Sequence, residues 1–215
     1  MKSTRWVQFV VTGSFTAILV AYFLVWLPQP AAGLTFIGLD LGEWVKFLPQ
    51  VRAGEVVASR IFFYLPPISL SMMILAWTVT WSDGRWQSWV VRILAVAIAF
   101  LAFPSVEAII DEPPSEWLLR LILVILVLIF ASISPLLKRF STNVLIRGSW
   151  LLILLLGLIG AILPTWAYFA VKGPASILLQ TDIGLGPGVW LNAAGHLLLV
   201  GTAAYLFITE ADSIP

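Results

Sequence analysis

The sequence has no cysteine and only one histidine, His196. Without cysteine the chain cannot form disulfides, thiolate metal sites, iron–sulfur clusters or a cysteine nucleophile. One histidine among widely spaced acidic residues gives no plausible zinc site, and the H-E-x-x-H pattern of zinc proteases is absent. The G-x-S-x-G pattern of serine hydrolases is missing as well. These absences favour a non-catalytic protein whose sequence requires no metal or cofactor.

Charged residues are also scarce. They make up 11% of the 215 residues, whereas hydrophobic residues make up 60%. Soluble domains carry about 25% charged residues. We therefore expect an integral membrane protein in which the chain, residues 1–215, forms a single transmembrane domain. The formal net charge of +1 gives no reason to expect nucleic acid as a partner, so the bilayer itself is the first partner.

Six apolar segments are close to the ~20 residues that cross ~30 Å of hydrocarbon. They predict an all-α polytopic membrane protein with helices at residues 6–27, 61–81, 89–110, 117–137, 149–171 and 188–208. The first apolar run is longer than that of a signal peptide, so we expect an anchor helix. Between the first two helices, apolar residues at helical spacing over residues 36–48 predict a short amphipathic helix in the membrane interface.

Lysine and arginine are distributed unevenly over the two sides that six helices define. Seven of the twelve lie on the side of the termini: Lys2, Arg5, Arg85, Arg92, Lys138, Arg139 and Arg147. Because positive residues favour the cytoplasmic side, we expect a multi-pass protein of the cell membrane with both termini in the cytoplasm. The eleven tryptophans fall near the expected helix ends, where indole rings anchor helices at the bilayer surface.

Prolines interrupt three of the predicted helices in the leaflet opposite the termini: Pro66 and Pro67, Pro104, and Pro164. A proline kinks a helix and leaves carbonyl groups that need other partners. Helices that splay there would leave an outward-facing cavity. Polar residues at or just below that depth are the candidate ligand-binding cluster: Asn192, His196, Glu107, Tyr64 and Thr165. Proline is common in membrane helices, so coincidence stays an open alternative.

His196 follows Asn192 by one helical turn, so the two side chains lie on the same face of the last predicted helix. Polar groups at membrane depth usually face the interior of a bundle, and we expect this helix to be the inner one. Three interpretations of His196 stay open. It is a neutral structural residue hydrogen-bonded between helices, an axial ligand of a haem or other tetrapyrrole, or a member of a proton relay with Glu107.

The first predicted helix carries small residues at every fourth position, Gly13, Ala17 and Ala21. Such a face lets another helix approach closely, either within the chain or from a partner subunit. We therefore expect a non-catalytic membrane subunit that packs against other membrane proteins or against itself. One alternative is a protein that binds or transports a small molecule in the outer-leaflet cavity, and a second is a pigment or haem subunit through His196. No residue motif identifies a family. The gross plan is similar, in topology only, to substrate-binding subunits of energy-coupling-factor vitamin transporters.

Overall fold

The computed structural model describes residues 5–28, 35–56, 58–81, 86–137 and 143–209. Within these ranges, five helices are long and apolar enough to cross a membrane. They are α1 (Arg5–Phe23), α4 (Leu65–Val79) with the preceding 3-10 turn η2 (Arg60–Tyr64), α7 (Pro114–Leu137), α8 (Asn143–Leu179) and α9 (Pro187–Thr209). Helix α5 (Trp86–Ala99), continued by the 3-10 turn η3 (Phe100–Ala102), is apolar but shorter. The fold is that of an all-α membrane protein.

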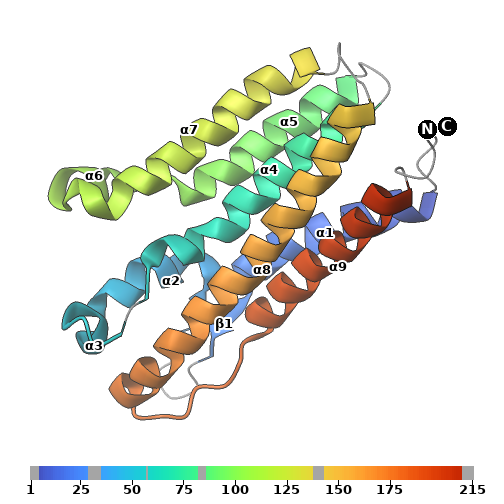
Figure 1. Ribbon diagram of the computed structural model, residues 1–215. Coiled ribbons are helices and arrows are strands. Elements are labelled where there is room, and N and C mark those ends of the chain that lie inside the picture. The colour runs from blue at the N-terminus through green and yellow to red at the C-terminus, as the bar shows by residue number, and fades with distance from the viewer. Residues whose placement is uncertain (1–4, 29–34, 57, 82–85, 138–142, 210–215) are drawn as a thin grey trace.

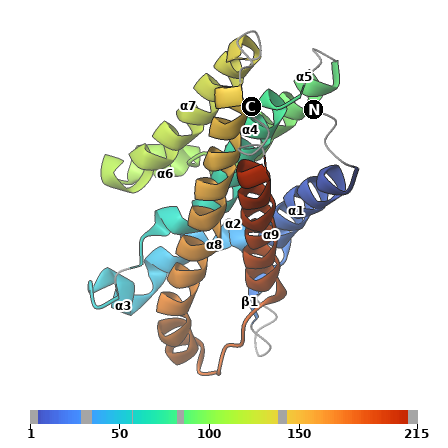
Figure 2. The same cartoon turned by 45° about the vertical axis from the view of Figure 1, so that its right-hand side comes forward.

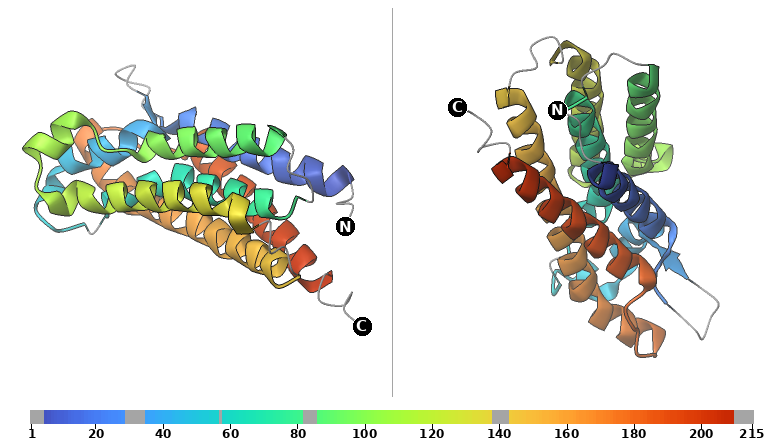
Figure 3. Two further views of the ribbon diagram at one scale, coloured as in Figure 1. Left: turned by 90° about the horizontal axis from the view of Figure 1, so that it is seen from above. Right: turned by 90° about the vertical axis from the view of Figure 1, so that its right-hand side faces the viewer.

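Helix α4 is the centre of the bundle (Figure 1). It packs on α8, α5, α7 and α1, and almost all of its residues are buried. Helix α9 packs on α8 and α1 at one side of the bundle, as the right-hand view of Figure 3 shows. One face of α9 is buried, but Trp190, Leu197 and Tyr205 are exposed. The expectation that the last helix is the inner one is therefore wrong, because the apolar surface of α4 is covered on more sides.

The outer surfaces of the helices are apolar. Helix α7 exposes an unbroken row of large aliphatic side chains, Ile122, Ile125, Leu126, Ile129 and Ile133. A continuous apolar surface of this length is unfavourable in water and favourable against lipid tails. The surface therefore agrees with the composition in placing the bundle in a membrane.

Helix α1 begins and α9 ends at the same end of the bundle, which we call the terminal end (Figures 1 and 2). There the ring centroids of Trp6 and Tyr205 lie 5.7 Å apart. The opposite end is the far end. It contains an antiparallel pair of short strands, β1 (Val25–Leu27) and β2 (Phe36–Ile37), with Val25 opposite Ile37. It also contains α2 (Gly38–Trp44), the 3-10 turn η1 (Val45–Phe47), α3 (Pro49–Arg52) and α6 (Val106–Asp111).

The amphipathic helix predicted over residues 36–48 is present as α2 and η1. Its apolar positions Leu41, Val45 and Leu48 are fully buried, and α2 packs on η2 and α1. Gly42 is required here, because a Cβ at this position would overlap the ring of Tyr64. The segment therefore covers the far end of the bundle.

Three predicted helix boundaries differ from the structure. The first helix was expected to reach residue 27, but it ends at Phe23, and β1 follows. Trp26 is fully buried there, and its indole N–H donates to the oxygen of Ala21 at 2.8 Å, which turns the chain back. The helix expected over residues 89–110 stops at Ala102, and α6 begins only at Val106.

The third difference is α8, which was expected over residues 149–171 and instead covers Asn143–Leu179 without interruption (Figure 2). It continues through Pro164 and Pro174 and so extends beyond its expected end at residue 171. Pro66 and Pro67 lie in the first turn of α4. Backbone N–H groups in the first turn have no acceptor within the helix, so a proline there removes no helical hydrogen bond. The two prolines begin the helix and do not interrupt it.

Candidate functional site

Asn192 and His196 lie on the buried face of α9 and contact α8 and α4. His196 Nδ1 is 2.9 Å from the backbone oxygen of Asn192, and Nε2 is 3.0 Å from Ser69 Oγ on α4. A carbonyl oxygen only accepts a hydrogen bond, so Nδ1 carries a proton. The Ser69 hydroxyl, which also donates to the oxygen of Pro66 at 3.2 Å, is the partner of Nε2, and both ring nitrogens therefore have partners.

Asn192 satisfies a backbone group that a proline leaves without its helical partner. Its Nδ2 donates to the backbone oxygen of Gly160 on α8 at 3.1 Å. Gly160 lies one turn before Pro164, which has no N–H to donate back to it. A Cβ at Gly160 would overlap the ring of His196 and the hydroxyl of Ser69, so only glycine lets α9 come this close. The carbonyl that Pro164 leaves without a helical donor and the polar face of α9 thus belong to one interaction.

The five residues expected to form one ligand-binding cluster lie in different places. Asn192 and His196 are in the core, Tyr64 lies at the far end, and Glu107 is exposed on α6. The hydroxyl of Thr165 on α8 and the Oδ1 of Asn192 are buried without a hydrogen-bond partner among the described residues. No hydrogen bond in the described ranges joins His196 to Glu107, so the structure does not bring the two groups of a proton relay together.

The surroundings of His196 bear on the pigment interpretation. An axial ligand needs a free ring nitrogen and space in front of it. Here Nε2 faces Ser69, and the ring packs against Gly160 so closely that even a methyl group there would overlap it. These residues do not fit the axial bond of a tetrapyrrole.

At the far end seven residues form a second polar centre, which we call the ionic cluster. They come from α2, η1, η2, the turn between α6 and α7, and α7: Glu43, Lys46, Arg60, Tyr64, Glu112, Glu116 and Arg120. The carboxylates of Glu43, Glu112 and Glu116 balance the charges of the three basic residues. The cluster therefore has no net charge and joins elements that are distant in sequence.

Arg60 links α2 to the start of α7. Only 9% of its side chain is exposed, and Nε donates to the oxygen of Gly42 at 2.9 Å. Its Nη2 lies 2.6 Å from Glu43 Oε2, and its Nη1 lies 2.9 Å from Glu112 Oε2. A guanidinium group suits this position because its planar fork donates in several directions at once.

Arg120 contacts both the end of η3 and helix α2. Its Nε and Nη2 donate to the oxygens of Ala102 (3.1 Å) and Phe103 (3.2 Å), where η3 ends in front of Pro104. Its Nη1 lies 2.6 Å from Glu43 Oε1, and its guanidinium carbon lies 3.6 Å from the centroid of the Tyr64 ring. One buried arginine thus caps the helix that Pro104 ends and holds α2 against the bundle.

Two carboxyl groups of the cluster, those of Glu43 and Glu112, are held in their charged form. Burial by itself raises the pKa of Glu43, but hydrogen bonds from Tyr64 and Arg120 and the charge of Arg60 lower it from 4.5 to about 2. For Glu112, burial is likewise outweighed by Lys46 and Arg60, which lower its pKa. The Lys46 ammonium lies 2.5 Å from Glu112 Oε1. Glu43 and Glu112 therefore stay ionised at neutral pH.

Two clefts flank the ionic cluster. The larger, about 720 Å³, lies between the α3 side and the start of α7 and is lined by Lys46, Phe47, Val51, Arg52, Ala58, Ser59, Arg60, Ile61, Glu112, Pro113, Ser115, Glu116 and Leu119. The smaller, about 410 Å³, lies between α2 and the end of η3 and reaches Glu43, Tyr64 and Arg120. The larger cleft is the candidate functional site.

The sequence identified Tyr64 as a candidate site residue, but it did not predict that Glu43, Arg60 and Arg120 form one cluster with it. Basic residues at the ends of apolar segments look like ordinary flanking charges. The available signal was the predicted topology, which places Glu43, Arg60, Glu112 and Arg120 on the same side of the bilayer. Acidic and basic groups gathered at one membrane surface are candidates for mutual pairing.

Comparison of the chain with protein-family models, with curated proteins and with solved structures finds no match.

The lowered pKa of Glu43 predicts how stability depends on pH. Its contribution is fully present above the ordinary value of 4.5 and is lost as pH falls toward about 2. We expect Glu43→Gln to lower the thermal unfolding midpoint in detergent by several degrees at neutral pH. We expect this difference to shrink on acidification from about pH 5 to about pH 3.

The matched control is Asp40→Asn on the same helix, because Asp40 is exposed and has no ion pair with a described residue. This variant should unfold like the wild type at every pH. If Glu43→Gln is as stable as the wild type, or if the difference between them does not change with pH, the ionic cluster does not stabilise the far end.

Proposed function

We propose that this chain is a non-catalytic protein of the cell membrane that binds a small amphiphilic molecule with an anionic group in the larger cleft. The observation that carries the proposal is the cleft itself. Its volume of about 720 Å³ lies within the range of small-molecule sites, roughly 300–1,000 Å³. Both charged and apolar side chains line the cleft, which suits a ligand with one charged and one apolar end.

The charges of the cleft favour an anion. The lining contains three basic side chains, Lys46, Arg52 and Arg60, and two acidic ones, Glu112 and Glu116. Its net charge is therefore +1. Lys46 and Arg60 are committed to the ionic cluster. Arg52 is exposed and forms no ion pair with a described residue, so it is the group that an incoming carboxylate or phosphate would meet.

The apolar part of the ligand has its own wall. Phe47, Val51, Ile61 and Leu119 line the cleft beside the charged groups. Ile61 and Leu119 lie at the start of η2 and near the start of α7, the two elements that lead from the far end toward the apolar bundle. An acyl or aryl chain in the cleft would therefore extend toward the membrane interior.

We propose a topology of six spans, with α5 as a short sixth span and both termini in the cytoplasm. The support is the excess of lysine and arginine at the sequence positions of the terminal end. In this orientation the cleft opens on the outer side of the membrane and is accessible to molecules outside the cell.

The binding proposal predicts that Arg52→Gln weakens binding of dodecanoate about tenfold, since one charge-assisted contact is worth about 1.4 kcal/mol. The measurement is titration calorimetry on protein in lipid nanodiscs, with dodecanol as the neutral analogue. Dodecanol should bind more weakly than dodecanoate.

Lys172→Gln is the matched control, because it removes one positive charge from the far half of α8, outside the cleft lining. It should leave dodecanoate binding unchanged. Equal affinity for dodecanoate and dodecanol, or unchanged binding in Arg52→Gln, would contradict the proposal.

A second candidate function is that of a membrane subunit that packs against a partner, and α1 supplies the observation that favours it. Within the bundle, α1 meets α9 at Gly195, where a Cβ would contact Ile18 and the oxygen of Ser14. Gly13 is not used in this contact. It is exposed, and a Cβ there would meet nothing within 4 Å. Of the predicted small-residue face, Ala21 is fully buried within the bundle, Ala17 is half-buried and Gly13 is exposed. The part of the face around Gly13 is therefore open to a helix of another protein.

Substitution of these two glycines separates internal packing from partner packing. We expect Gly13→Leu to leave the thermal midpoint of the isolated protein unchanged and to abolish co-purification of a partner or self-association. Gly195→Leu should lower the midpoint, because its side chain would push α9 away from α1. A wild-type protein that leaves the native membrane as a lone monomer would exclude the subunit function.

A further inference from the structure

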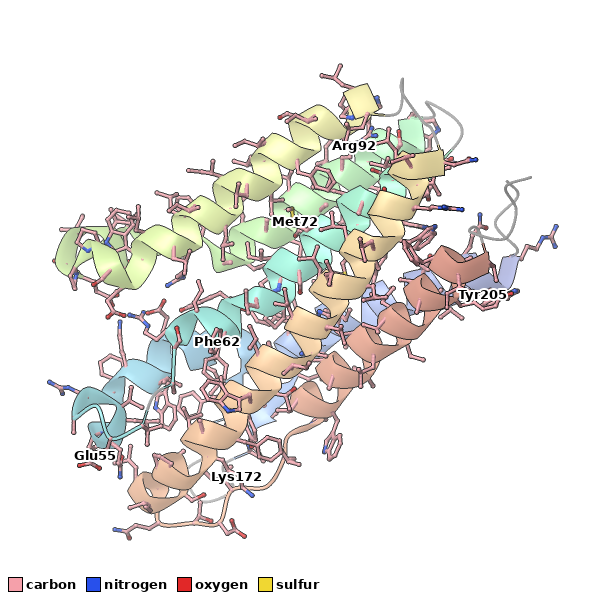
Figure 4. The ribbon with its side chains drawn as sticks, in the orientation of Figure 1. Glu55, Phe62, Met72, Arg92, Lys172 and Tyr205 are labelled. Carbon is pink, nitrogen blue, oxygen red and sulfur yellow. The ribbon has the colours of Figure 1, made fainter. Side chains whose placement is uncertain are left out.

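The terminal end contains a buried arginine whose surroundings differ from those of Arg60 and Arg120. Arg92 lies on α5 where this helix faces α7 (Figure 4), and only 4% of its surface is exposed. Its Nε donates to Ser134 Oγ at 2.9 Å, and its Nη1 donates to Ser88 Oγ at 3.3 Å. Its Nη2 is buried without a hydrogen-bond partner in the described ranges, and no acidic residue in those ranges pairs with Arg92.

The partners of Arg92 do not neutralise it. Both are serine hydroxyls, and that of Ser134 also donates to the oxygen of Ala131 at 3.2 Å. Ala131 lies one turn before Pro135, which cannot donate to this carbonyl. An arginine keeps its proton under all conditions in a protein, so its charge has to be compensated by a counter-charge. In the described part of the chain, Arg92 contacts hydroxyl groups and an aromatic ring, whereas the arginines of the ionic cluster contact carboxylates.

The depth of Arg92 in the membrane indicates where the counter-charge comes from. Arg92 lies six residues after Trp86, the start of α5, which is about 9 Å along the helix at ~1.5 Å per residue. Trp86 and Trp89 are exposed beside it, and tryptophan marks the level of the lipid head groups. The guanidinium carbon lies 5.3 Å from the centroid of the Trp89 ring. A long arginine side chain at this level extends readily toward the head groups.

We propose that Arg92, with Ser88 and Ser134, binds the phosphate group of an anionic phospholipid in the leaflet of the terminal end. A phosphate takes two parallel hydrogen bonds from a guanidinium group, and Nη2 is the donor that lacks a partner. In the sequence, Lys138 and Arg139 follow directly after α7, and basic residues next to a membrane helix favour anionic lipids. Inorganic phosphate has the same chemistry, so the test includes it.

The test is native mass spectrometry of the full chain released from nanodiscs that contain equal amounts of phosphatidylglycerol and phosphatidylcholine. We expect the wild type to retain one phosphatidylglycerol and Arg92→Gln to retain it at least tenfold less. Arg92→Lys keeps the charge but loses the two parallel hydrogen bonds, so its retention should be intermediate. Inorganic phosphate at millimolar concentration should not displace the lipid.

Arg5→Gln is the control, because it removes an exposed cation at the same end, and it should retain the lipid like the wild type. The thermal midpoint of each variant with and without phosphatidylglycerol shows which variants fold. Equal retention of the two lipids by the wild type overturns the proposal. The proposal is also overturned if Asp83→Asn lowers the thermal midpoint while phosphatidylglycerol does not raise the midpoint of the wild type. Asp83 would then be the counter-ion of Arg92. Displacement by inorganic phosphate would assign the site to a soluble anion and overturn the lipid assignment.

Discussion

A backbone carbonyl that has lost its helical hydrogen bond needs another donor inside a bilayer, because neither water nor lipid supplies one. In this chain Pro104, Pro135 and Pro164 each create such a need. Asn192 donates to the carbonyl before Pro164, and Arg120 donates to the two carbonyls before Pro104. Ser134 donates to the carbonyl before Pro135 and receives Arg92. These polar side chains thus lie where a proline leaves a backbone carbonyl without its helical donor.

The same constraint explains how much of the fold could be predicted from the sequence. Composition and apolar run lengths predicted membrane helices, and the prolines predicted carbonyls in need of donors. The sequence alone does not show which helices are neighbours, so it could not pair Asn192 with Gly160. Nor could it predict that α8 continues through Pro164, because that depends on a donor from α9. Glu43 and Arg120 are 77 positions apart, and their pairing depends on how α2 folds back over the bundle.

The two ends of the molecule compensate their buried arginines in different ways. At the far end Arg60 and Arg120 meet carboxylates, so the ionic cluster is neutral and the cleft beside it keeps Arg52 as its one uncommitted cation among the described residues. At the terminal end Arg92 meets hydroxyl groups. This difference is the basis of the two proposals, an anionic ligand in the cleft at the far end and an anionic lipid at the terminal end.

The most direct test of this account is a double-mutant cycle of Pro164→Ala and Asn192→Leu, measured by reversible unfolding in mixed micelles. Asn192→Leu alone should cost about 1–2 kcal/mol, because it leaves the carbonyl of Gly160 unsatisfied. In the Pro164→Ala background, residue 164 regains an N–H for that carbonyl, so the account predicts a cost smaller by about 1 kcal/mol. Costs that add within about 0.3 kcal/mol would contradict it, because Asn192 would then act independently of the proline.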